Sequence, residues 1–131
     1  MATRQAKRFK IKVHLSLRYI LRFHQDDAEF EAECIDAATT GLGATQQEAL
    51  QDLIINLNAL HKFSSEEGGN MLTEATKDDE RTYARLAAGQ PVDPSVLGYG
   101  VVRLVELIPA GQPKAESQAQ FEIGQHTSFA A

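Results

Sequence analysis

The chain contains no tryptophan and a single cysteine, Cys34. One cysteine excludes a disulfide framework within the chain and any zinc site that needs a pair of cysteines. No apolar run is long enough to cross a membrane, because the most apolar helical stretch, Leu53 to Leu60, is short and carries Asn56 and Asn58. The first ten residues are basic and have no apolar centre, unlike a signal peptide. We therefore expect a soluble, cytoplasmic protein without membrane contact.

The length and composition predict one globular domain. The 131 residues are 43% hydrophobic and 24% charged, which is enough for a single core but not for two ordinary domains. With 6 Phe and 3 Tyr, that core must be mostly aliphatic. We expect a basic flexible arm over residues 1–8, one domain over 9–108, and a polar, mobile tail over 109–131.

The net charge of −5 conceals an uneven distribution. Residues 1–25 hold seven lysines and arginines and no acid, whereas the rest of the chain holds six basic and 18 acidic residues. Two functional interpretations follow: the basic start contacts nucleic acid or an acidic partner, or the acidic body attracts a basic partner. The structural interpretation is a solvated strand face preceded by disordered residues.

A strict alternation runs from Phe9 to Phe23, where every odd position is apolar or aromatic. A period of two over this length predicts a long strand. The polar stretch from His24 to Ala28 predicts a hairpin turn, followed by a second strand over Glu29 to Ile35 and a third over Ala37 to Leu42. Two hairpins in succession predict an antiparallel β-β-β meander.

A helix is predicted to begin at Thr45, because Thr45 and Glu48 have the spacing of a capping box. Apolar residues recur behind them at helical spacing: Ala49, Leu50, Leu53, Ile54, Leu57 and Leu60. We expect this amphipathic helix to pack on the sheet, and a short second helix to run from about residue 78 to 88 and stop at Gly89. The β-branched run from Val101 to Ile108 predicts a further C-terminal strand, so the fold class is α+β.

The stretch from Leu17 to Phe63 resembles the HicB-like antitoxin family. Members run strand, turn, strand with an Ala-Glu-Cys ending, third strand, and then Gly-x-Thr-x-x-Glu-Ala-Leu into a helix. This chain has Ala32-Glu33-Cys34, eight intervening residues, and then Gly43-Ala44-Thr45-Gln46-Gln47-Glu48-Ala49-Leu50. It departs from the family in its extended first strand, its longer segment 64–88, and the lack of a helix-turn-helix or ribbon-helix-helix segment after the last strand.

The resemblance implies a partial ribonuclease-H-like sheet with one helix layer. It also implies a role, because family members neutralise a small basic RNA-cleaving toxin by binding over its active surface. An acidic body suits such a partner. The expected function is therefore a non-catalytic protein-binding module. The alternatives are a nucleic-acid-binding protein that uses the basic N-terminal strand, and an orphan HicB-like domain with another protein partner.

The candidate partner-binding residues are Glu29, Glu31 and Glu33, which alternate along the second predicted strand and share one face. Three such carboxylates can also bind a metal, or form the solvated side of a half-buried sheet. Two-metal nuclease chemistry needs carboxylates clustered on inward-facing strand positions, and the first strand has none. We therefore expect no catalytic residue, no metal and no cofactor, so an enzyme is the least favoured class.

The histidines and the cysteine favour structural roles. His14, His24, His61 and His126 have no spacing typical of a metal site. His61 is predicted to cap the C-terminal end of its helix, where a cation is favoured. Cys34 falls in the apolar register of the second strand, which predicts a buried apolar residue and not a nucleophile.

The sequence Gly41-Leu42-Gly43 precedes the first helix and bears a faint similarity to a phosphate-binding loop. It lacks the third glycine and the lysine of the known loops. We therefore interpret the two glycines as part of a turn into the helix.

The first predicted strand is longer than its hairpin partner can cover. Its unpaired part would present Ile11, Val13 and Leu15 together with free backbone N–H and C=O groups. Such an edge is a template for pairing with another chain. We therefore expect a homodimer or a higher even oligomer, closed by a two-fold axis through residues 9–16.

Overall fold

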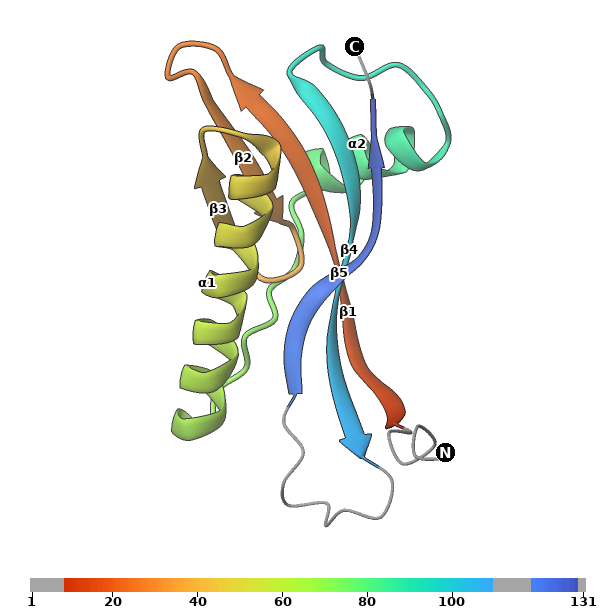
Figure 1. Ribbon diagram of the computed structural model, residues 1–131. Coiled ribbons are helices and arrows are strands. Elements are labelled where there is room, and N and C mark those ends of the chain that lie inside the picture. The colour runs from red at the N-terminus through yellow and green to blue at the C-terminus, as the bar shows by residue number, and fades with distance from the viewer. Residues whose placement is uncertain (1–8, 110–118, 130–131) are drawn as a thin grey trace, which may run out of the picture.

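The computed structural model describes residues 9–109 and 119–129, with side chains over 11–106 and 119–129. In chain order, its elements are β1 (Phe9–His24), β2 (Glu29–Cys34), β3 (Thr39–Gly43), α1 (Gln46–Glu67), α2 (Lys77–Ala87), β4 (Val96–Pro109) and β5 (Ala119–Ser128). The strands form one twisted antiparallel sheet in the order β3-β2-β1-β4-β5, with α1 and α2 set apart on its two sides (Figure 1). The predicted α+β class is confirmed, with its meander, its long packed helix and its short second helix.

β1 is the central strand and is paired on both sides over different lengths. β2 pairs with its second half, from Tyr19 to His24, whereas β4 pairs with it from Phe9 to Arg22. The prediction that its first half is unpaired is therefore wrong on the β4 side, whereas β2 does leave the other edge uncovered before Tyr19, as predicted. The first half of β1 is paired because β4 extends for 14 residues and reaches the start of β1.

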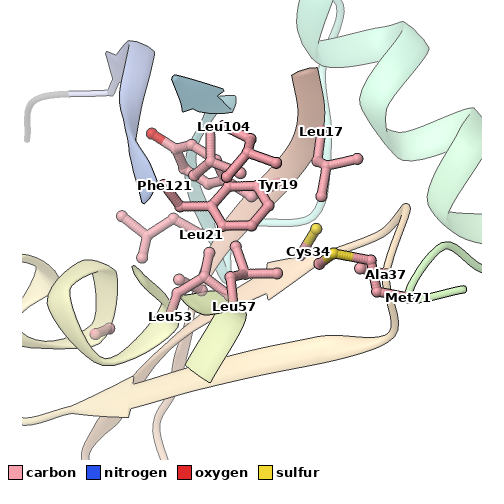
Figure 2. Packing of buried hydrophobic residues seen from close by; sticks show 13 residues of the cluster. Leu17, Tyr19, Leu21, Cys34, Ala37, Leu53, Leu57, Met71, Leu104 and Phe121 are labelled. Carbon is pink, nitrogen blue, oxygen red and sulfur yellow. The ribbon is translucent and has the colours of Figure 1, made fainter. Parts of the chain in front are cut away.

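The face of the sheet that α1 covers contains the main hydrophobic core (Figure 2). Tyr19 and Leu21 of β1 are fully buried there against Leu53 and Leu57 of α1. Cys34 lies in the same cluster with no exposed surface, as predicted. Burial raises the pKa of its thiol to about 11, so the thiol stays protonated at neutral pH.

The opposite face of the sheet is covered by α2. Because side chains alternate along a strand, Ile20 points away from the core that holds Tyr19. It belongs to a second buried cluster, which consists of Ile20, Ile35, Leu86 and Val96. The Tyr83 ring of α2 packs edge-on against Tyr99 of β4, with centroids 5.5 Å apart. The sheet therefore has a helix on each face, whereas the family resemblance implied one helix layer.

A β-bulge at His14 changes which face the start of β1 presents. Val13 pairs with Val105, whereas Leu15 pairs with Leu104, so His14 is an extra residue in β1. Neighbouring positions of β4 point to opposite faces, and Val13 and Leu15 must therefore do the same. The prediction that the odd positions share one face fails here. Leu15 packs on the main core, but Val13 is 45% exposed.

α1 begins at the predicted cap. The Thr45 Oγ1 atom accepts a hydrogen bond from the Glu48 N–H at 3.1 Å. The Glu48 carboxylate accepts in return from the N–H of Ala44 at 3.0 Å, one residue before the donor that a capping box predicts. The reciprocal arrangement fixes the angle at which the chain enters the helix.

Gly41 and Gly43 lie in β3 and not in a turn, which corrects the prediction from the sequence. A Cβ atom on Gly41 would lie 2.2 Å from the backbone nitrogen of Leu53, and one on Gly43 would lie 2.6 Å from that of Ala49. No side chain fits at these distances. The two glycines therefore allow the backbone of α1 to lie directly on β3.

The predicted mobile tail is wrong for residues 119–128, which form β5 and pair with β4. Phe121 of β5 is buried in the main core, and its N–H donates to the Asn58 Oδ1 atom of α1 at 2.8 Å. A strand with so few apolar residues gives little signal in the sequence. Residues 110–118 and the predicted arm over 1–8 lie outside the described residues.

We predict that Gly41→Ala lowers the free energy of unfolding by about 1–3 kcal/mol, because the new methyl group must push α1 away from the sheet. Urea unfolding measures the change. Gly69→Ala is the matched control, since no atom lies within 4 Å of its added Cβ. Equal stabilities for the two variants would contradict the close approach.

We also predict that Thr45→Ala lowers the free energy of unfolding by about 0.5–2 kcal/mol, through loss of the hydrogen bond to the Glu48 N–H. Thr45→Ser keeps the accepting hydroxyl and serves as the control. If the alanine and serine variants melt alike in denaturant, Thr45 does not act as the cap.

Candidate protein-binding site

The structure places Glu29, Glu31 and Glu33 on β2 as predicted, but two of them are paired within the chain. Glu31 accepts from the His24 Nε2 atom at 2.8 Å, and Glu33 pairs with Arg22. Among the described side chains, Glu29 has no such partner. The three residues therefore do not form a continuous free acidic row on the sheet.

Two arginines of β1 hold the first turn of α2 on the sheet. Arg18 contacts Asp36 and Glu80, each at 2.7 Å. Arg22 contacts Asp79 at 3.2 Å as well as Glu33. The acidic residues of α2 lie at its N-terminal end, where the helix dipole also favours negative charge. This set of contacts, which we call the arginine clamp, joins α2 to the central strand.

Ionisation of Asp36 depends on the arginine clamp. Burial by itself raises the pKa of Asp36, but hydrogen bonds from the side chain and the backbone N–H of Arg18 outweigh it and hold the pKa below the ordinary 3.8. The guanidinium of Arg18 also lies over the Tyr83 ring, 5.5 Å from its centroid. Arg18 and Arg22 are thus engaged with acids of the same chain, which leaves fewer basic groups of the N-terminal strand for phosphate.

A groove of about 800 Å³ lies at the hairpin end of the sheet. Its walls come from four distant segments: the β1–β2 hairpin, the start of α1, the loop before β4 and the end of β5. They include Phe23, Phe30, Leu97 and Phe129 among the apolar groups and Asp26, Asp27 and Asp93 among the acidic ones. Apolar side chains and carboxylates therefore meet in one opening.

Backbone hydrogen bonds fix the walls of this groove. The N–H of Phe23 donates to the Ser95 carbonyl at 2.8 Å, and the N–H of Phe129 donates to the Leu97 carbonyl at 2.8 Å. The rings of Phe23 and Phe30 pack with centroids 4.8 Å apart and are half-buried. The aromatic surface of the groove is consequently held by the sheet and does not depend on a loop alone.

The acidic residues of the groove face solvent. Asp26 and Asp27, in the hairpin turn, are exposed and have no hydrogen-bond or ion-pair partner among the described residues. Asp93 accepts from the Ser95 N–H at 2.8 Å, and backbone and side-chain hydrogen bonds with Ser95 lower its pKa. We call this opening, with its phenylalanines and three aspartates, the acidic groove.

The predicted oligomer edge is less open than the sequence suggests. Ile11 and Val13 are 64% and 45% exposed, but β4 pairs with this part of β1 on one side. On the α1 face, a hollow lined by Leu15 and by residues 69–72 shows that the segment after α1 passes close to β1. The homodimer remains a prediction, but its expected surface shrinks to the first residues of β1.

The histidines do not come together at one site. His14 bonds to Glu106 at 2.8 Å, and His24 bonds to Glu31. His61 does not cap its helix, because it lies inside α1 with its ring edge-on to Phe121, 6.1 Å away. In the part of the chain that the structure describes, no group of three or more His, Cys, Asp or Glu side chains is arranged to hold a metal ion.

His126 forms an arrangement that the sequence did not predict. Its Nδ1 atom lies 2.6 Å from the hydroxyl of Tyr19, and the two rings stack at 5.9 Å. Burial raises the pKa of the Tyr19 hydroxyl, and burial lowers that of His126. Gly100 leaves the space for this contact, since a Cβ there would lie 2.6 Å from the Tyr19 oxygen. The pair fastens β5 to β1 across β4.

Sequence reasoning identified the acids of the hairpin turn but not the groove. Asp26 and Asp27 lie in the stretch for which the sequence predicts a hairpin turn, whereas Phe129 lies in the predicted tail and Asp93 in a segment with no predicted site. The available signal was the pair of phenylalanines flanking the turn, Phe23 and Phe30. Their cross-strand pairing places both rings beside the turn acids.

Comparison with protein-family models, with curated proteins and with solved structures finds no match to this chain. Neither described helix is apolar enough along its length to span a membrane.

We predict that the arginine clamp makes stability fall in acid. Because the folded-state pKa of Asp36 is depressed, its contribution is fully present above the ordinary pKa of 3.8 and is lost as the pH falls through the lower folded value. Urea unfolding between neutral pH and about pH 3 measures this loss. Asp36→Asn should be less stable than the wild type at neutral pH, with the difference shrinking in acid. A constant difference at every pH would contradict the prediction.

Proposed function

We propose that this chain is a non-catalytic, cytoplasmic protein-binding module that binds a small basic protein at the hairpin end of its sheet. The acidic groove is the observation that carries the proposal. It combines an aromatic surface with three solvent-facing carboxylates, which suits a segment with both apolar and cationic side chains. The resemblance of residues 17–63 to HicB antitoxins supports an RNA-cleaving toxin as the basic protein.

The charge of the whole described surface supports a basic partner. Residues 11–106 and 119–129 hold eight lysines and arginines against seventeen aspartates and glutamates, which leaves a charge of −9. The arginine clamp neutralises part of this charge beneath α2. The hairpin end has no comparable basic residue among the groove-lining side chains, so its negative charge remains available. Complementary charge speeds the encounter of two proteins and disfavours wrong partners.

We expect that a small basic protein is encoded beside the gene for this chain, and the experiment uses that protein. We predict that it cleaves RNA and slows growth when expressed alone, and that this chain abolishes both effects at equal stoichiometry. Asp26→Asn combined with Asp27→Asn and Asp93→Asn should weaken binding by about tenfold or more, which is about 1.4 kcal/mol. Isothermal titration calorimetry measures the affinities, and inhibition of RNA cleavage measures the function.

The matched control removes the same charge elsewhere. Glu66→Gln, Glu67→Gln and Glu74→Gln alter three exposed residues away from the groove, and this variant should bind like the wild type. Equal affinity for the groove variant and the wild type would contradict the proposed site. An absence of binding to the basic protein would contradict the proposed partner. RNA binding by this chain alone would instead favour the nucleic-acid alternative.

A further inference from the structure

The chain contains a basic segment, residues 1–8, whose charge suits the acidic groove. Residues 1–8 contain Arg4, Lys7 and Arg8 and no acid. The described surface around the groove has three carboxylates and exposed or half-exposed phenylalanines. The basic side chains of this segment thus match the carboxylates of the groove, and a cation is also attracted to the face of a phenylalanine ring.

The segment cannot reach the groove of its own chain. The groove is lined by Phe23 and His24, at the C-terminal end of β1, whereas residues 1–8 precede Phe9 at the other end. Fourteen residues of strand separate Phe9 from Phe23, a distance of roughly 46 Å at ~3.3 Å per residue. Eight residues span at most about 29 Å when fully extended. Figure 1 shows the two ends of β1 at opposite ends of the molecule.

A second copy of the chain can place its residues 1–8 at the acidic groove of the first copy. When two copies lie side by side with their β1 strands antiparallel, the start of one β1 is directed towards the hairpin end of the other. Each copy then offers one basic segment and one groove, so the two contacts are equivalent and a two-fold axis closes the pair. No third copy is needed to satisfy either surface.

We propose that the acidic groove binds the basic segment 1–8 of a second copy of this chain, giving a two-fold symmetric dimer with exchanged segments. This differs from a dimer formed by direct pairing of β1 edges. Lys12 is exposed on that edge, and a lysine there discourages pairing with an identical edge. The exchange needs no basic partner protein, but such a partner would compete for the same groove.

Charge reversal tests the exchange by sedimentation equilibrium. The full chain should be a dimer that weakens at least tenfold between low and molar salt, because exposed charge pairs are screened. Arg4→Glu with Lys7→Glu and Arg8→Glu should be monomeric, and so should Asp26→Lys with Asp27→Lys. Glu66→Lys with Glu67→Lys, the control at the end of α1, should remain a dimer. Circular dichroism melts establish that each variant is folded.

Mixing the two monomeric variants gives the decisive measurement. The acidic segment of one variant matches the lysine-bearing groove of the other, so an equimolar mixture should form a heterodimer. A single chain that carries both reversals should again form a homodimer. A wild-type chain that stays monomeric at high micromolar concentration overturns the proposal. Variants that associate as tightly as the wild type also overturn it, as does failure of the mixture to associate. Because no basic partner is present, these results are independent of the proposed function.

Discussion

The central position of β1 is the constraint on which the rest of the structure depends. Its alternating side chains serve two layers at once: Tyr19 and Leu21 belong to the core beneath α1, while Arg18, Ile20 and Arg22 meet α2. Both layers are therefore tied to one strand that is paired on both sides. A change in the register of β1 would move every one of these contacts to the wrong face.

The same strand decides which acidic residues remain free. Arg18 and Arg22 form ion pairs with acidic residues from three parts of the chain, namely Asp36, Glu33 and the first turn of α2. Those carboxylates serve the packing of α2 and are partly shielded from solvent. Beyond Arg22 the strand runs into the hairpin turn, where no arginine follows. The negative charge of Asp26 and Asp27 is consequently left on the surface, beside the half-buried Phe23 and Phe30.

A surface of this kind combines two properties that usually belong to binding sites. Its phenylalanine rings offer apolar area, and backbone hydrogen bonds hold Phe23 to Ser95, just before β4, and Phe129 to Leu97 of β4. The carboxylates add a preference for positive charge. Binding of a rigid surface loses less conformational entropy than binding of a mobile loop. The groove is thus suited to a basic segment, whether that segment comes from another protein or from a second copy.

The sequence by itself determined the order of the first three strands, the start of α1 at Thr45, the short second helix and the burial of Cys34. Each of these rests on local periodicity or on hydrogen bonds between near neighbours. Only the tertiary structure decided that polar residues 119–128 complete the sheet and that His14 forms a bulge. It also decided that the backbone of α1 packs directly on Gly41 and Gly43. It also decided the groove, since Phe129 and Asp93 reach Phe23 through contacts between segments about seventy to a hundred residues apart. Local patterns carry no record of such pairings, because register and layer order depend on the packing of the whole chain.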